Sequence, residues 1–242
     1  MQALLARRNI VAVGIIVFAI LPTVANAYIV FVANLALMYI LLSVGLNMLL
    51  GYAGQLAFPN AALFGVGAYT SGLLRLEFDL PYWITLPAGA AFATLIGLAI
   101  ALPALRLRGL YLALATIAFA QAALWVFGHW NSVTYGGAGF RVPPMDFSPL
   151  PLDPSTGIYY LTLIIVLVAV PLGWNMLRSR VGRAWVALRE SEVAAATLGI
   201  DLTRYKAYAY VVSGLYAGTA GAIFSALLGI VTPESFDLFQ VI

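Results

Sequence analysis

Long apolar runs without charged residues alternate with short charged segments along this chain. The first uncharged run covers residues 9–74, and the others cover 80–105, 109–140, 154–177 and 207–233. A helix that crosses a bilayer needs about 20 apolar residues, so the first run has room for three crossings and each other run for one. The pattern predicts an all-α integral membrane protein, a polytopic helical bundle with about seven transmembrane helices. We expect these helices near residues 10–27, 28–50, 57–74, 82–102, 110–129, 158–177 and 207–229.

The composition agrees with a membrane protein. The chain of 242 residues is 63% hydrophobic and 9% charged, whereas a soluble domain carries roughly 25% charged residues. We expect one transmembrane domain over residues 1–242, surrounded by the lipid bilayer. The chain has no cysteine, which excludes disulfides, thiolate chemistry and cysteine metal sites.

The residue types also exclude several kinds of chemistry. Lys206 is the only lysine, and because Tyr205 precedes it, the chain lacks the Gly-Lys pair of an ATP-binding P-loop. His129 is the only histidine, and no nucleophile has a base beside it. No basic patch indicates nucleic acid. We therefore expect no enzyme activity, no cofactor and no metal.

The predicted spans contain no acidic residue, although ion-coupled transporters usually need an ionisable group inside the membrane. A pore-forming subunit that a partner energises fits this better. An ion-coupled carrier or a channel that acts alone stays open, because sodium sites made of carbonyl and hydroxyl groups need no acid.

Residues 178–206 form a charged segment between two apolar runs. The segment holds six of the chain's 12 basic residues and three of its 9 acids, so it must lie in water beside the membrane. Helix formers and Ser191, which can cap a helix, predict two short helices at 183–190 and 192–198. Gly199 fits the left-handed position after the second helix. The segment either lies on anionic lipid or docks on a soluble partner.

The basic residues orient the chain. With a cytoplasmic N-terminus, ten basic residues lie inside and only Arg75 and Arg141 lie outside, as the positive-inside rule requires. The apolar run from Ile10 to Leu21, with Arg7-Arg8 before it and Ala25-Asn26-Ala27 after it, is also similar to a signal peptide; we favour a retained helix. The Pro- and Gly-rich segment 130–157 is expected to be an irregular outer lid.

Residues 45–74 are unusually rich in glycine and contain one central proline. Such residues break a membrane helix, and a broken backbone is tolerated only against protein or a water-filled cavity. Transporters often build their sites this way, so we predict a translocation pathway there. For any single glycine, close helix packing is the alternative. The predicted pathway residues are Asn47, Gly51, Gly54, Gln55, Asn60, Gly65 and Gly67.

Three motifs together resemble one protein family. They are Gly45-Leu46-Asn47 with Gly51-Tyr52-Ala53-Gly54-Gln55-Leu56 and Gly65-Val66-Gly67-Ala68-Tyr69; Arg106-Leu107-Arg108-Gly109-Leu110-Tyr111; and Gly182-Arg183-Ala184 with Arg189-Glu190, Leu198-Gly199-Ile200 and Pro233-Glu234-Ser235. The chain resembles the membrane permease of bacterial ATP-binding-cassette importers for branched-chain amino acids, the longer of that system's two permeases.

The resemblance implies a bacterial inner-membrane importer with a second permease subunit, two ATP-binding-cassette ATPase subunits and a periplasmic substrate-binding protein. It also implies that 178–206 couples to the ATPase. The coupling residues would be Gly182, Arg183, Arg189, Glu190, Glu192 and Gly199. Permeases for urea or short amides look alike and remain the alternative within this class.

Two departures from the family pattern matter. The family usually has a small–small–Gly–His run where this chain has Ala57-Phe58-Pro59-Asn60. Family members also continue with further helices, so the resemblance implies that Ile242 ends a fragment.

The orientation can be tested with single cysteines, because the chain has none of its own. We predict that Ser179→Cys reacts with a membrane-impermeant thiol reagent only from the cytoplasmic side, and that Ser148→Cys reacts only from outside. Labelling of intact spheroplasts and of inverted vesicles measures this. The reverse pattern would overturn the orientation.

Overall fold

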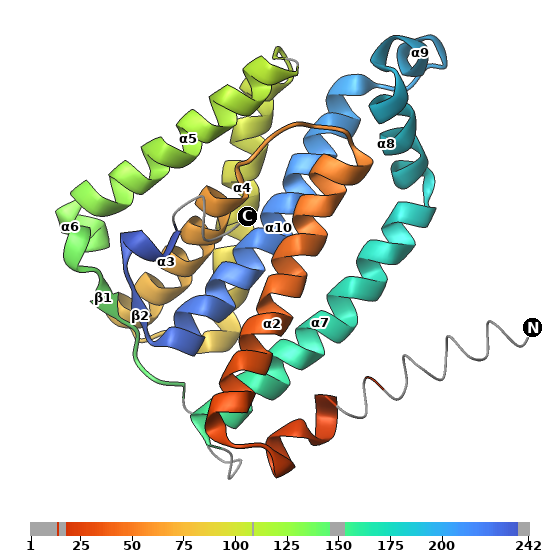
Figure 1. Ribbon diagram of the computed structural model, residues 1–242. Coiled ribbons are helices and arrows are strands. Elements are labelled where there is room, and N and C mark those ends of the chain that lie inside the picture. Colours follow the sequence, from red (N-terminus) through yellow and green to blue (C-terminus); the bar gives the residue numbers. More distant parts are fainter. Residues whose placement is uncertain (1–13, 15–17, 108, 146–152, 237–242) are drawn as a thin grey trace, which may run out of the picture.

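The computed structural model describes residue 14 and residues 18–107, 109–145 and 153–236, and these form a helical bundle (Figure 1). The long helices are α2 (Ala27–Leu46), α3 (Asn60–Phe78), α4 (Tyr82–Ala104), α5 (Leu110–His129), α7 (Pro154–Arg178) and α10 (Leu202–Leu228). The short elements are η1 (Asn47–Tyr52), α6 (Asn131–Thr134), η2 (Gly136–Ala138), β1 (Phe140–Arg141), α8 (Arg180–Glu190), α9 (Glu192–Thr197), β2 (Ile230–Val231) and η3 (Pro233–Phe236).

The predicted all-α polytopic architecture is confirmed. Five of the described helical stretches are long and apolar enough to cross a membrane: α2 with η1, α4, α5, α7 and α10. Helix α3 is not among them, and it carries Arg75 and Glu77 in its last turn. Residues 10–13 and 15–17 of the predicted helix at 10–27 lie outside the described residues, and residues 18–24 are helical. The count of seven spans therefore stays a prediction.

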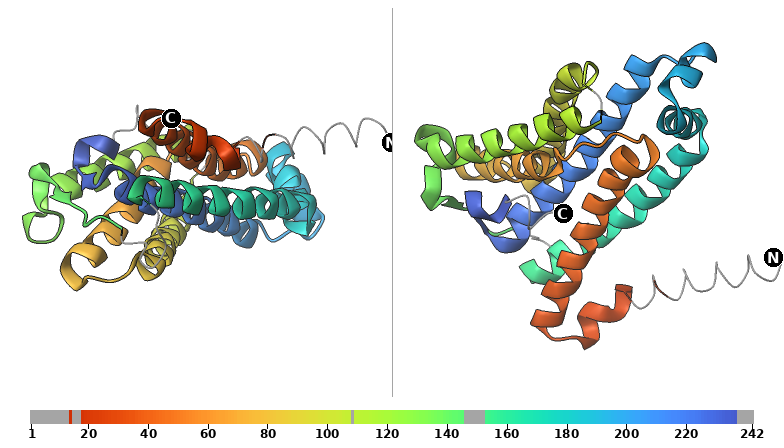
Figure 2. Two further views of the ribbon diagram at one scale, coloured as in Figure 1. Left: turned by 90° about the horizontal axis from the view of Figure 1, so that it is seen from below. Right: turned by 45° about the horizontal axis from the view of Figure 1, so that its top comes forward.

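Helix α10 occupies the centre of the bundle. It packs against α2, α3 and α4, and in Figure 2 it runs between the pair α2–α7 and the pair α3–α4. Several of the closest contacts involve glycine. A Cβ at Gly67 of α3 would lie 2.6 Å from the Cα of Gly218, and a Cβ at Gly97 of α4 would lie 2.9 Å from the carbonyl oxygen of Tyr210. The backbones thus touch, as small residues allow in membrane helices.

This packing decides the role of two predicted pathway glycines. Gly67 lies between α3, α10 and α4, and Gly65 faces the rings of Phe127 and Phe236. Both are fully buried. For these two residues, the structure favours the packing alternative.

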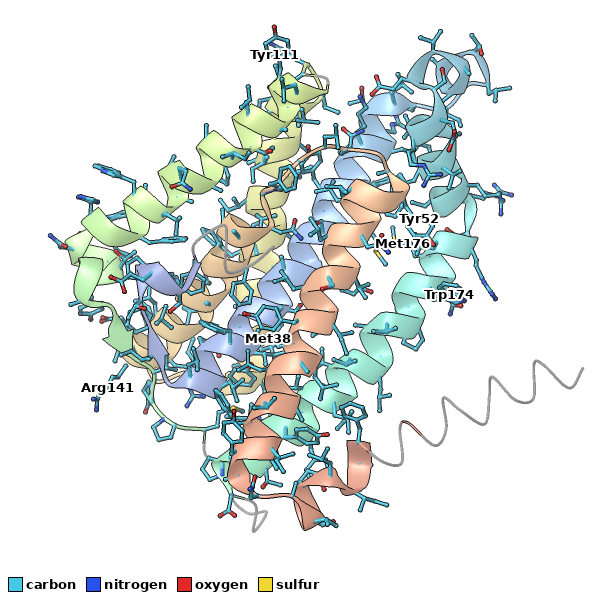
Figure 3. The ribbon with its side chains drawn as sticks, viewed as in Figure 1. Met38, Tyr52, Tyr111, Arg141, Trp174 and Met176 are labelled. Atoms are coloured by element: carbon cyan, nitrogen blue, oxygen red, sulfur yellow. The ribbon has the colours of Figure 1, made fainter. Side chains whose placement is uncertain are left out.

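The charges separate toward the two ends of the bundle. We call the end that carries Arg106 and residues 178–206 the basic end, and the end that carries Arg75 and Arg141 the loop end. Figure 3 shows Arg141 and Tyr111 at opposite ends. At the basic end the Arg178 guanidinium lies 4.9 Å from the centre of the Trp174 ring.

The loop after α5 is more ordered than the expected irregular lid. Its strand β1 pairs antiparallel with β2, which follows α10. Arg75 of α3 donates hydrogen bonds to the carbonyls of Pro143 and Pro144, at 3.1 and 2.9 Å. A hydrogen bond from Tyr135 to Glu77 also fixes the loop and raises the pKa of the Tyr135 phenol. Residues 146–152 of the predicted lid lie outside the described residues.

The glycine contacts predict a difference between two Gly→Ala changes. At Gly67 the added methyl group meets the backbone of α10, so the helices must separate; overpacking of this kind costs about 1–3 kcal/mol. At Gly128 nothing lies within 4 Å. Thermal unfolding in detergent should show a lower midpoint for Gly67→Ala and an unchanged midpoint for Gly128→Ala. Equal midpoints would contradict the backbone contact.

Candidate coupling and translocation site

The chain between α2 and α3 is a broken helix. Helix α2 continues as the π-helix η1, and residues 53–59 then follow an irregular course to α3. The Oδ1 atom of Asn47 lies where a Cβ of Gly51 would be, so glycine makes room for it. The break is fixed at its far end, where the Phe58 amide donates to Oγ1 of Thr116 in α5 at 3.0 Å. π-Helical turns of this kind are frequent at functional sites.

The break contacts the charged loop directly. Gly54 has a φ of +65°, a conformation that favours glycine. A Cβ at Gly54 would lie 2.9 Å from the Cα of Arg189 in α8. The Arg189 guanidinium donates to the Gly51 carbonyl at 2.9 Å. Predicted pathway and coupling residues therefore meet at one contact, 138 positions apart in sequence.

The two short helices of the charged loop form as predicted, with Ser191 between them. Ser179 caps α8 and Ser191 caps α9, each accepting a backbone N–H, from Val181 at 3.1 Å and Ala194 at 3.3 Å. Gly199 has a φ of +77° and ends α9, in a Schellman motif. Helix α8 begins at Arg180, three residues before the predicted start, because Ser179 supplies its cap.

The loop is held to the bundle by buried side chains. The indole of Trp185 in α8 is fully buried and donates to the carbonyl of Tyr205 in α10 at 2.8 Å. Lys206 is 4% exposed and forms an ion pair with Glu192 of α9. Helix α10 begins at Leu202, earlier than the predicted 207, because Asp201 caps it by accepting from the Arg204 amide. Lys206 is thus part of a membrane helix rather than of a loop.

The six predicted coupling residues face different ways. Glu192 pairs inward with Lys206, Arg189 reaches the helix break, and Gly182 packs on the backbone of Leu177. Arg183, Arg189 and Glu190 are exposed, and Glu190 pairs with Arg189.

Helix α9 and its C-terminal turn present apolar side chains outward. Val193 is 71% exposed and Leu198 is 78% exposed. The sequence spacing places Val193, Ala196 and Ile200 on one side. That side does not face the bundle, because Val193 and Ala196 are exposed and Ile200 is half-buried.

The predicted pathway residues do not converge on one cavity. Asn47 is exposed, Gln55 is buried and donates to the Ala53 carbonyl, and Asn60 is buried, accepting from Ser213 at 2.9 Å. None of the predicted pathway residues lines the described cavities between α4 and α5, among α2, α7 and α10, or at the loop end.

One polar residue escaped the sequence-based prediction. Asn34 of α2 is buried and lines the cavity at the loop end. The sequence could have indicated Asn34, because it is the one amide side chain in the apolar sequence of α2. Within the described residues, no group of three or more His, Asp or Glu side chains could hold a metal.

A bundle of long apolar helices with a folded, charged loop at one end places the chain among the polytopic helical membrane proteins. Residues 28–242 match the family described as "Branched-chain amino acid transport system / permease component". The chain belongs to this family.

Curated relatives agree with this assignment. The chain is similar to the high-affinity branched-chain amino acid transport system permease protein LivM of Escherichia coli (strain K12), with 32% identity over 97% of this chain and 61% of the relative. It is also 32% identical to LivM of Salmonella typhimurium (strain LT2), over 86% of this chain and 55% of the relative. The chain thus spans less than two thirds of either relative. No solved structure matches it.

The contact between Gly54 and α8 can be tested with a matched pair of glycines. Gly54 and Gly109 both have positive φ, at +65° and +54°, but nothing lies within 4 Å of Gly109. Alanine adds backbone strain at both positions, and only at Gly54 does the added methyl group displace α8. We predict that Gly54→Ala lowers uptake into vesicles at least tenfold, whereas Gly109→Ala lowers it less than twofold. Similar losses of uptake in the two variants would show that backbone strain, and not the contact with α8, causes the effect.

Proposed function

We propose that this chain forms the transmembrane permease subunit of an ATP-driven importer for branched-chain amino acids. As a single permease domain it would assemble in the bacterial inner membrane with a second permease, two ATP-binding-cassette ATPase subunits and a periplasmic substrate-binding protein. The ATPase subunits would supply hydrolysis. The basic end, with the N-terminus, would face the cytoplasm.

The contact between α8 and the helix break carries this proposal. A permease needs an element that a soluble ATPase can push and a membrane segment that responds. Arg189 joins two such elements through the Gly51 carbonyl and the close approach to Gly54. Family membership and the basic residues gathered at this end, as expected of a cytoplasmic face, support the same function.

The docking surface proposed here differs from the charged surface expected from the sequence. Because Glu192 is paired with the buried Lys206, reversing its charge would disturb the fold of the loop itself. The exposed apolar pair Val193 and Leu198 is better suited to a partner. Removing exposed apolar side chains from water at an interface is favourable, whereas charges at the rim, here Arg183 and Glu190, contribute little.

Force on α9 would then reach the membrane through α8. Arg189 lies at the last turn of α8, beside Glu190 and next to α9. A displacement of this turn must move the Gly51 carbonyl or break the hydrogen bond. The segment 53–59 would carry the displacement to α5 through Phe58 and Thr116. In this way ATP binding by the partner could open or close the region around the break.

One added charge separates ATPase docking from lipid anchoring. Leu198→Arg puts a cation on the exposed turn after α9; it should weaken an apolar interface but strengthen binding to anionic lipid. Leu110→Arg is the matched control, since Leu110 is also exposed but is the first residue of α5, whose start lies away from α9 in Figure 1. We expect Leu198→Arg to reduce co-purification of the ATPase at least tenfold and Leu110→Arg to leave it unchanged.

Uptake in proteoliposomes completes this test. Leu198→Arg should abolish ATP-dependent leucine uptake while the chain still inserts and unfolds at the wild-type temperature. Wild-type co-purification would overturn the docking surface. Leucine uptake without any ATPase would favour a carrier or channel that acts alone, and uptake of urea or short amides in place of leucine would favour the related importer class.

A further inference from the structure

A cavity of about 230 Å³ lies at the loop end, away from the helix break. Its walls come from the first half of α2, the first turn of α7 and the last turn of α10, and residues 142–145 contribute one side. This side is fixed in place: the Val142 amide donates to the Gly229 carbonyl at 3.0 Å, and Arg75 holds the Pro143 and Pro144 carbonyls. The cavity is therefore built by ordered parts of the chain.

Asn34 lines this cavity with a side chain that has no partner. The residue is 1% exposed, and neither Nδ2 nor Oδ1 has a hydrogen-bond partner in the structure. Burying an unsatisfied amide costs roughly 1–3 kcal/mol for each lost partner. The amide is covered by this chain's own helices, so any ligand that reaches it must displace part of the cavity wall. The unsatisfied donor and acceptor indicate a small ligand that offers one of each.

Two helix ends complete the polar lining. Ser155 belongs to the first turn of α7, which has no side-chain cap. Pro154 has no N–H and the Gly157 amide donates to the Asp153 carbonyl, so the amides of Ser155 and Thr156 are the ones without an acceptor. Leu227 and Leu228 belong to the last turn of α10, which presents carbonyl groups. A helix N-terminus attracts negative charge and a C-terminus attracts positive charge. A ligand with both charges, close together, matches these two ends.

The rest of the lining is apolar and uncharged. Among the described residues, no Asp, Glu, Lys or Arg lines the cavity; Arg75 contacts the carbonyls of Pro143 and Pro144, and Asp153 is exposed before α7. A net charge would therefore stay unpaired, which is costly in an apolar site. An engineered cavity of ~150 Å³ holds benzene, so this one can hold a molecule somewhat larger. The main apolar lining residues are Val30, Phe31, Met145, Ile158, Leu227 and Leu228.

We propose that this cavity is a binding site for a zwitterionic aliphatic amino acid on the outer side of the permease. The carboxylate would accept from the first turn of α7 and from Nδ2 of Asn34. The ammonium would donate to Oδ1 of Asn34 and to carbonyls at the end of α10, and the aliphatic side chain would lie against the apolar wall. This inference rests on the proposed function, and it adds that the permease itself selects cargo.

Ordered water is the competing occupant. Each water takes up about 30 Å³ and needs two to four polar partners, and Asn34 with the helix ends could hold a few. If water fills the cavity, Asn34 has only a local structural role, and replacing it does not affect amino-acid binding. The two occupants predict different results when the amide is removed without loss of volume.

The test measures binding of radiolabelled leucine to the purified permease complex in lipid nanodiscs, without the substrate-binding protein. Asn34→Leu keeps the size of the side chain and removes its donor and acceptor. Ser155→Trp blocks the exposed mouth without changing the core. The matched control is Asn175→Leu, the same substitution at an exposed position of α7 outside the cavity.

We expect wild type and Asn175→Leu to bind leucine equally, and Asn34→Leu and Ser155→Trp to bind at least tenfold more weakly. Valine should compete, whereas 4-methylpentanoate, which lacks the ammonium, and isopentylamine, which lacks the carboxylate, should compete at least tenfold less well. The thermal midpoint of Asn34→Leu should equal or exceed that of the wild type, since an unsatisfied amide is removed.

Unchanged leucine binding by Asn34→Leu, or no saturable binding by the wild type, would overturn the site and leave water as its occupant. Ser155→Trp keeps the test decisive if Asn34→Leu fails to fold. ATPase-dependent leucine uptake is measured separately. Normal uptake without this binding overturns only the site, whereas absent uptake overturns the proposed function.

Discussion

The direct contact of backbones at the centre of the bundle is the constraint on which the structure depends. Gly67 meets Gly218, and Gly221 meets the Phe64 carbonyl, so α3 and α10 approach as closely as helices can. In a membrane the hydrophobic effect does not drive helices together, and close packing must do so. This packing fixes α10, and α10 in turn positions the charged loop at one end and the cavity that Asn34 lines at the other.

The charged loop depends on α10 in a second way. Trp185 and Glu192 attach α8 and α9 to the first turns of that helix, through Tyr205 and Lys206. A buried ion pair of this kind contributes little net stability, but removing one partner leaves a buried charge. The loop therefore keeps one arrangement relative to α10, and the apolar side chains beyond it stay exposed and available to a partner.

Local patterns allowed much of the fold to be predicted. The bounds of α5 and the break at Ser191 followed from charge-free runs and a capping residue. Helix α10 begins earlier than predicted. A charged residue predicts the end of a membrane span, but Lys206 lies within the helix because it is paired and buried. The contact of Arg189 with Gly51 and the isolation of Asn34 could not be predicted, because each depends on residues brought together by folding. Glycine spacing alone could not separate the packing roles of Gly65 and Gly67 from the turn at Gly54.

Helix α10 begins beside the charged loop and ends at the cavity without a break. Its 27 residues make a rod of about 40 Å. The glycine contacts around Gly218 would act as the pivot of this rod, with a longer arm toward the loop and a shorter arm toward the cavity. A tilt of ~5° about that point would move the loop arm by ~2 Å and the cavity arm by ~1 Å in the opposite direction, from the rise per residue. A displacement of α10 at the basic end would then change the width of the cavity at the loop end.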